Sequence, residues 1–104
     1  MDNTAGQWIS VEIDQELMPV VPEYLEYRRL DCAEIKRLLA AGDLEYIQIM
    51  GHRMKGSGGS YGFDEISVIG EALELAAQDV DADGISAAVR HLETYLDRVS
   101  VKYI

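Results

Sequence analysis

The sequence contains few of the residues that cross-link a small fold or break its helices. It has one cysteine, Cys32, and two prolines, both before residue 23. A single thiol cannot form a disulfide within the chain, which excludes a disulfide-held fold and favours a reducing compartment. The chain beyond residue 22 is also free of the strongest helix breaker.

Basic residues and long apolar runs are scarce as well. Nine Lys and Arg stand against 19 Asp and Glu, a formal net charge of -10. Nucleic acids and anionic membrane surfaces bind Lys/Arg patches, so this balance argues against both as partners. No apolar run is as long as a membrane span or a secretory signal. We therefore expect a soluble cytoplasmic protein whose partner is another protein or a small ligand.

The apolar residues beyond Pro22 recur at helical spacing and predict four amphipathic helices. We expect the helices to run from Pro22 to about Gly42, from Asp43 to Gly62, from Asp64 to Val80 and from about Gly84 to Val99. Val80 is expected on an inner face. Connections this short place successive helices antiparallel. The predicted fold class is all-α, an antiparallel up-down four-helix bundle.

The N-terminal part is predicted separately. Residues 1–7, MDNTAGQ, have the composition of a disordered start, and residues 8–104 are expected to form a single domain. The segment WISVEIDQELMPVV carries Trp8, Ile13, Leu17 and Val20. We expect it to form a short extra capping helix over one end of the bundle.

The stretch GHRMKGSGGSYGF, residues 51–63, is expected to hold the functional site. Each glycine inside a helix costs about 1 kcal/mol relative to alanine, so several beside one histidine indicate another purpose. His52 lies off the inner stripe, and Lys55, Gly56 and Gly59 follow three, four and seven residues later on the same surface. The absent side chains at Gly56 and Gly59 would let another macromolecule approach His52.

Two residues before His52 are candidates for the same surface. Gln48 extends its line backwards along the helix. Ile49 lies off the inner stripe, so it either belongs to an apolar partner patch or turns partly toward the core. His91 lacks comparable surroundings and is expected to be a surface residue, and Cys32 to be an inert apolar residue of the first helix.

An exposed imidazole next to a lysine suits phosphoryl transfer. A neutral imidazole nitrogen is a nucleophile near neutral pH and can accept a phosphoryl group. Lys55 can then bind the phosphoryl oxygens, unless it is a plain surface lysine. The sequence has no glycine-rich nucleotide loop and no residues at the spacing of a metal site, so we expect neither a cofactor nor a metal in this chain.

His52, Lys55 and Gly56, followed by Gly62-Phe63, resemble the histidine-containing phosphotransfer (HPt) family, whose pattern is H-x-x-K-G. The resemblance covers roughly residues 20–100. It implies a four-helix bundle in which His52 is the phosphoryl acceptor, Lys55 contacts the phosphate, and Gly56 and Gly59 leave room for a receiver domain. Gly58 departs from the family, which commonly has Ser or Ala at that position.

The stretch GSYGF is also similar to the phosphotransfer domain of chemotaxis kinases. In that group a glutamate on the following helix orients the histidine ring. Counting along this sequence puts Glu74 at the matching position. The resemblance thus assigns Glu74 an orienting role, and the alternative is that it is an ordinary exposed carboxylate.

The resemblance implies a phosphorelay carrier of two-component signal transduction rather than an autonomous enzyme. Its partners would be the receiver domain of a response regulator and a histidine kinase or hybrid kinase, with Mg²⁺ bound on the receiver. Nothing in the sequence demands more than a monomer. Two alternatives remain: an adaptor that binds these partners without phosphorylation, and a domain excised from the N-terminus of a chemotaxis-type kinase. Met1 and an end soon after the fourth helix favour a free-standing protein.

Overall fold

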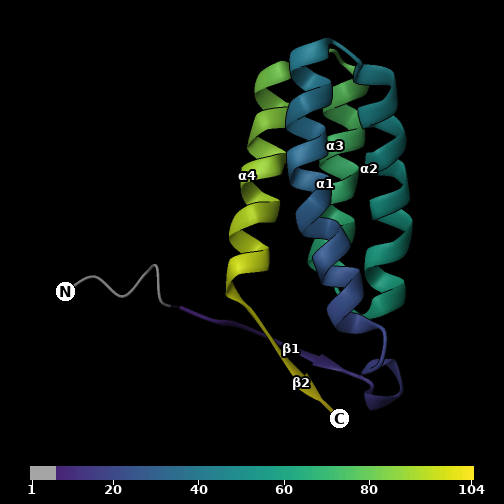
Figure 1. Cartoon of the computed structure of the whole chain (residues 1–104), viewed down its shortest axis with the longest axis vertical. Coiled ribbons are helices and arrows are strands. Elements are labelled where there is room, and N and C mark those ends of the chain that lie inside the picture. The colour runs from purple at the N-terminus through teal and green to yellow at the C-terminus, as the bar shows by residue number, and fades with distance from the viewer. Residues whose placement is uncertain (1–6) are drawn as a thin grey trace, which may run out of the picture.

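Four helices form most of the chain, as the apolar spacing predicts. The computed structural model describes residues 7–104, in which the helices are α1 (Val21–Ala41), α2 (Leu44–Gly58), α3 (Asp64–Gln78) and α4 (Ala82–Arg98). Figure 1 shows them side by side along the long axis of the molecule, joined by tight turns. The predicted all-α class and four-helix bundle are confirmed.

The ends of the helices follow from local hydrogen bonding. Gly42 ends α1 in the left-handed region at φ 77, and its N–H donates to the carbonyls of Leu38 and Leu39. The carboxylate of Asp43 then accepts from the N–H of Tyr46 and begins α2. Because these caps satisfy the free backbone groups, the connection between α1 and α2 needs few residues.

Two predicted helix ends are shifted. The second helix ends at Gly58 and is followed by one 3-10 turn, Gly59–Tyr61, which Gly62 closes at φ 92. The third ends at Gln78, so the inward position predicted for Val80 is wrong. Val80 is 73% exposed and adopts φ 54, because the chain reverses there to enter α4.

The predicted N-terminal capping helix is also wrong. The segment forms a strand, β1 (Ile9–Ile13), and one 3-10 turn, Gln15–Leu17. β1 pairs in parallel with β2 (Val99–Tyr103), in the register Ile9 opposite Val99. Both strands alternate apolar and polar residues, which is the spacing of a half-buried strand rather than of a helix.

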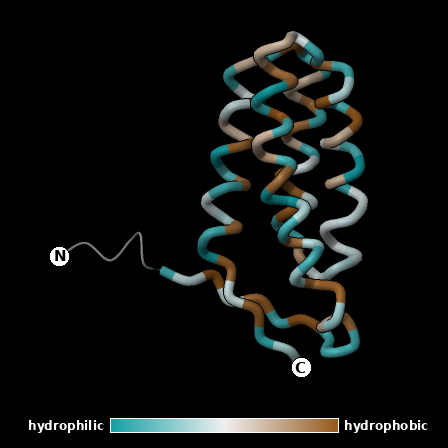
Figure 2. Tube along the Cα trace, in the orientation of Figure 1, coloured by the Kyte–Doolittle hydropathy of each residue, from teal (hydrophilic) through white to brown (hydrophobic). Residues whose placement is uncertain are grey.

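This two-stranded ribbon closes one end of the bundle (Figure 1). Ile13 is 1% exposed and packs against Gly62 at the turn between α2 and α3. Figure 2 shows that apolar residues recur along each helix and gather again at the ribbon end. The disordered start predicted for residues 1–7 lies outside the described residues, except for Gln7, which is exposed and has no regular structure.

The closest helix pair is α2 with α3, and glycines on both helices allow it. A β-carbon on Gly51 would lie 2.6 Å from the backbone nitrogen of Glu74, and one on Gly70 would collide with the backbone nitrogen of Lys55. Gly58 meets Ser67 in the same way. The two backbones therefore approach at distances that no larger residue permits.

Candidate functional site

His52 lies near the middle of α2, between the buried Gly51 and the exposed Arg53. Its side chain is 71% exposed. The position agrees with the helical spacing, because the buried residues of α2 are Ile47, Met50, Gly51, Met54 and Gly58. The imidazole is therefore open to solvent and to a partner.

A carboxylate on the neighbouring helix holds one nitrogen of this ring. Nδ1 of His52 lies 3.0 Å from Oε2 of Glu74. An ionised carboxylate only accepts hydrogen bonds, so Nδ1–H donates and the lone pair of the neutral ring is on Nε2. Glu74 is 19% exposed in its side chain, so the protein restrains the acceptor much more than the ring.

The same carboxylate also faces Lys55. Nζ of Lys55 lies 3.8 Å from Oε1 of Glu74, and the lysine side chain is 46% exposed. Glu74 therefore contacts the ring with one oxygen and pairs with the lysine through the other. Glu74 is 22 residues from His52 in the sequence, and yet the three side chains form one cluster across α2 and α3.

Gly51 and Gly70 bring this cluster together. Gly51 precedes His52 and receives the backbone of Glu74, while Gly70 receives the backbone of Lys55. A larger residue at either position would move α3 outward and carry the carboxylate away from the ring. Sequence reasoning did not single out Gly70 for this role, because its partner lies on another helix.

The two glycines predicted to leave room for a partner lie in different surroundings. Gly56 is exposed, and a β-carbon there would meet no atom within 4 Å. Gly59 is exposed in the 3-10 turn, and its N–H donates to Oγ of Ser67 at 2.8 Å. Ser67 in turn donates to the carbonyl of Lys55 at 2.7 Å, so it joins the end of α2 to α3. Sequence reasoning missed Ser67, whose contacts come only from the fold.

Gln48 and Ile49 line a shallow hollow together with His52 and Glu74. Ile49 is 42% exposed and lies on the outer side of α2, whereas Gln48 is half-buried toward α3. An exposed apolar residue next to a solvent-facing imidazole is a surface that a partner can cover. The seven predicted site residues thus come from α2, from the 3-10 turn that follows it and, for Glu74, from α3.

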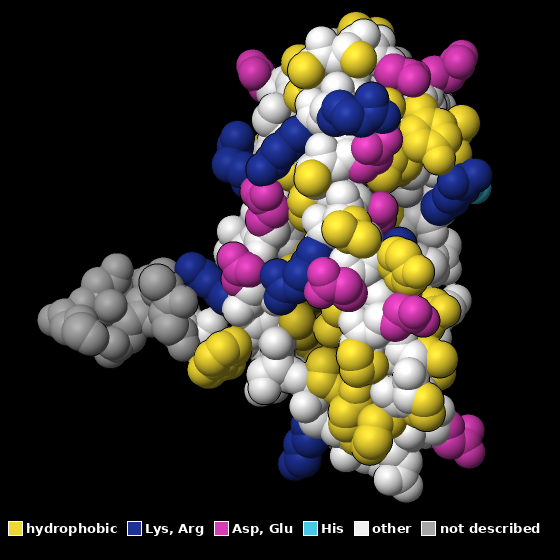
Figure 3. Space-filling model, viewed as in Figure 1, with side chains coloured by type: hydrophobic (Ala, Val, Ile, Leu, Met, Phe, Trp, Pro, Cys, Tyr) yellow, Lys and Arg dark blue, Asp and Glu magenta, His cyan; other side chains and the backbone are white. Residues whose placement is uncertain are grey.

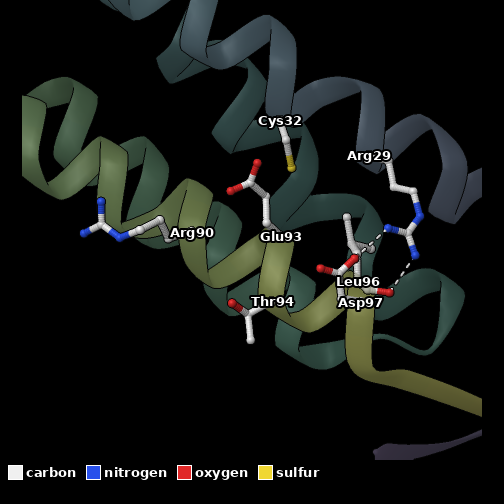
Figure 4. A pocket seen from close by; sticks show the side chains of 7 residues that line it. All are labelled: Arg29, Cys32, Arg90, Glu93, Thr94, Leu96 and Asp97. Carbon is white, nitrogen blue, oxygen red and sulfur yellow. Dashed lines mark hydrogen bonds and ion pairs between the residues drawn. The ribbon is translucent and has the colours of Figure 1, made fainter. Parts of the chain in front are cut away.

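The face formed by α1 and α4 carries charged side chains of both signs. Figure 3 shows Lys/Arg and Asp/Glu side chains interleaved along this face. A hollow between these helices contains Cys32 and is crossed by Arg29, which contacts Asp97 at 3.1 Å and the carbonyl of Leu96 at 2.7 Å (Figure 4). Burial raises the pKa of the Cys32 thiol to about 11, which makes it a poor nucleophile.

The second histidine lies apart from this cluster. Nε2 of His91 lies 2.8 Å from Oε2 of Glu65, across α4 and α3, on an exposed surface. Within residues 7–104, no group of three or more His, Cys, Asp or Glu side chains is placed to hold a metal ion. None of the helices described is long and apolar enough to cross a membrane.

One comparison with known proteins found a match. A model of the Hpt domain family matches residues 12–101, and the chain therefore belongs to the Hpt domain family. Members of this family are phosphocarriers of two-component signalling and not kinases. Searches of curated proteins and of solved structures found no match.

Proposed function

We propose that this protein is a phosphorelay carrier in which Nε2 of His52 accepts a phosphoryl group from a receiver-domain aspartate or a kinase and passes it to another receiver aspartate. The observation that supports it is the 3.0 Å contact between Nδ1 of His52 and Glu74, on a histidine that is otherwise solvent-exposed. A contact of this kind selects the tautomer whose free nitrogen points outward.

In the transfer step, the imidazole ring of His52 is the only group of this chain that forms a bond. The Nε2 lone pair forms the N–P bond while the bond from phosphorus to the donor oxygen breaks and that oxygen keeps its electron pair. The ring becomes an imidazolium that retains its proton on Nδ1. Glu74, as the acceptor of that proton's hydrogen bond, stabilises the positive charge that develops. The reverse sequence returns the phosphoryl group to an aspartate.

Lys55 and the glycines have separate roles in this proposal. Lys55 offsets the charge of the phosphoryl oxygens, since it follows His52 by three residues on the same helix. Gly56 and Gly59 admit the backbone of the receiver, and Gln48 and Ile49 contact it beside the ring. The receiver brings the Mg²⁺ and the acidic residues of the reaction, which requires close approach to His52.

A phosphorylation assay tests the proposal. The purified protein is incubated with a phosphorylated receiver domain, and separately with phosphoramidate, and its intact mass is recorded. We expect a single phosphoryl adduct, labile in acid and stable in base, that is absent in His52→Gln. His91→Gln is the matched control, since His91 is also exposed and also contacts a carboxylate. Receiver binding without any adduct would replace this proposal with a phosphorylation-independent adaptor.

A further inference from the structure

Two cations flank His52 on opposite sides of α2. Lys55 lies on the side toward α3, where it contacts Glu74. Arg53 lies on the side toward α1, because it lines both the hollow beside His52 and the groove between α1 and α2 that contains Arg28. Nothing in the sequence pattern singles out Arg53, since it is one exposed arginine among several.

The two cations differ in how far their charge is already neutralised. Lys55 is paired with Glu74 at 3.8 Å. Among the residues from 7 to 104, no carboxylate lies within 4.0 Å of the Arg53 guanidinium, whereas Arg28, Arg29, Lys36 and Arg37 each have such a partner. In a protein of net charge -10, an unneutralised arginine next to the candidate acceptor is the charge that an incoming anion meets.

The orientation of the ring decides which cation is closer to a phosphoryl group. The two nitrogens of an imidazole point outward in nearly opposite directions. Because Nδ1 is directed at Glu74 on α3, Nε2 points away from α3. A phosphoryl group on Nε2 is therefore displaced from the pair that Lys55 forms with Glu74 and toward the side of α2 from which Arg53 extends.

We infer that Arg53 is a phosphoryl-contacting residue, whose guanidinium binds the oxygens of the group carried on Nε2 of His52. The inference rests on the proposed function. A guanidinium presents a planar fork of N–H donors that matches phosphoryl oxygens in pairs, and it stays charged at every physiological pH. Lys55 then offsets phosphoryl charge from the Glu74 side of the ring, and Arg53 binds the phosphoryl oxygens from the other side.

The inference predicts a shift in the ionisation of the phosphoryl group. A cation close to these oxygens favours the doubly ionised form and lowers the second phosphoryl pKa. Loss of one charge at contact distance in a solvent-exposed site corresponds to about half a pH unit. Glu45 and Glu74 also line the hollow, and Lys55 pairs with Glu74. These charged groups are unchanged when Arg53 is replaced, so the difference reports Arg53 alone.

The experiment uses phosphoramidate as donor, so that no receiver takes part and docking does not affect the result. The phosphorylated protein is titrated by ³¹P NMR as wild type, Arg53→Gln, Arg53→Lys and Arg90→Gln. Arg90 is the matched control: it is an exposed arginine on α4, outside the hollow beside His52, and Figure 4 shows it extending away from the neighbouring side chains. We expect the ³¹P midpoint to rise by about half a unit in Arg53→Gln, to recover largely in Arg53→Lys and to be unchanged in Arg90→Gln.

Failure of this inference is distinct from failure of the proposed function. If wild type forms the adduct on His52 and Arg53→Gln has the same ³¹P midpoint as wild type, Arg53 does not contact the phosphoryl group. An equal rise in Arg53→Gln and Arg90→Gln would mean that only net charge acts, and would also overturn it. If wild type forms no adduct, the proposed function itself is wrong and the role of Arg53 falls with it.

Discussion

Gly51 and Glu74 approach each other so closely that a β-carbon on the glycine would lie 2.6 Å from the backbone nitrogen of the glutamate. This contact fixes how far α3 lies from α2 at the level of His52. The carboxylate reaches Nδ1 at 3.0 Å because the backbone that carries it has no side chain in its way. A packing residue thus controls the geometry of the candidate site.

Replacing Gly51 with alanine is expected to damage both stability and chemistry. The added methyl must push α3 away, which destabilises the fold by about 1–3 kcal/mol, as overpacking does elsewhere. It also lengthens the contact between His52 and Glu74, so phosphorylation by phosphoramidate should slow. Urea unfolding and the rate of adduct formation measure the two effects. Normal values for both would show that α3 can shift without cost.

Replacing Glu74 with glutamine is expected to slow phosphorylation of His52 roughly tenfold, since the imidazolium loses a charge-assisted hydrogen bond. Glu65→Gln is the matched control, because Glu65 contacts the other histidine in the same way. Rates follow from intact mass against time with phosphoramidate. If Glu74→Gln reacts as fast as Glu65→Gln, the carboxylate has no part in the reaction.

Two replacements of Gly56 test its effects on stability and on transfer separately. No atom lies within 4 Å of a β-carbon at this position, so Gly56→Ala should stabilise α2 by about 0.5–1 kcal/mol. Gly56→Gln fills the docking space and should lower transfer from a phosphorylated receiver about tenfold or more, through misalignment of the two reacting groups. Its phosphorylation by phosphoramidate should stay at the wild-type rate, and a parallel loss there would mean that Gly56 acts within the chain.

Burial of Asp31 predicts a dependence of stability on pH. Burial raises the pKa of Asp31 above its ordinary value of 3.8, against the opposing effect of the Arg28 guanidinium. A carboxyl with a raised folded pKa contributes stability at low pH and loses it as pH rises through that pKa. The stability of Asp31→Asn relative to wild type should therefore increase between about pH 3 and pH 6.

Glu34 is expected to change stability with pH in the opposite direction to Asp31, and it serves as the comparison. Its hydrogen bond with Arg37 lowers the pKa of the Glu34 carboxyl, so its contribution is present at neutral pH and is lost in acid. Glu34→Gln should therefore fall behind wild type as pH rises over the same range. Urea unfolding at several pH values measures both variants, and trends of equal sign would contradict the assignment for Asp31.

Truncation of Ile13 tests the ribbon. Ile13 is 1% exposed, and replacing it with alanine should destabilise the fold by about 2–5 kcal/mol. Ile9→Ala is the control in the same strand, since Ile9 is 39% exposed and loses much less buried surface. Thermal unfolding compares the two. Equal small losses would mean that the ribbon contributes little to the bundle.

The sequence predicted the helices because their apolar residues repeat over several turns, and it placed the start of the second helix at Asp43, whose side chain caps α2. It did not predict the ribbon. ISVEI and VSVKY alternate over only five residues each, and the partner strand lies at the other end of the chain. The helical spacing of Trp8, Ile13 and Leu17 over the same segment therefore misled the interpretation.

The sequence predicted the roles of some residues of the candidate site and not of others. The spacing from His52 to Lys55 and Gly56 lies within one helix, so the sequence contains it directly. The contact with Glu74 needed a family resemblance, because it crosses between two helices. Gly70 carries no local signal of its role, since a close approach becomes visible only when both backbones are placed.

The parallel pairing of β1 and β2 has a mechanical consequence. In the register of Ile9 opposite Val99 and Ile13 opposite Tyr103, the chain enters the ribbon at one end and leaves it at the other. A force that pulls the two termini apart therefore slides the strands past each other and strains all their hydrogen bonds together, instead of opening them one at a time. The ribbon is therefore loaded in shear. Tension on the termini reaches the helices around His52 only after the hydrogen bonds between β1 and β2 break.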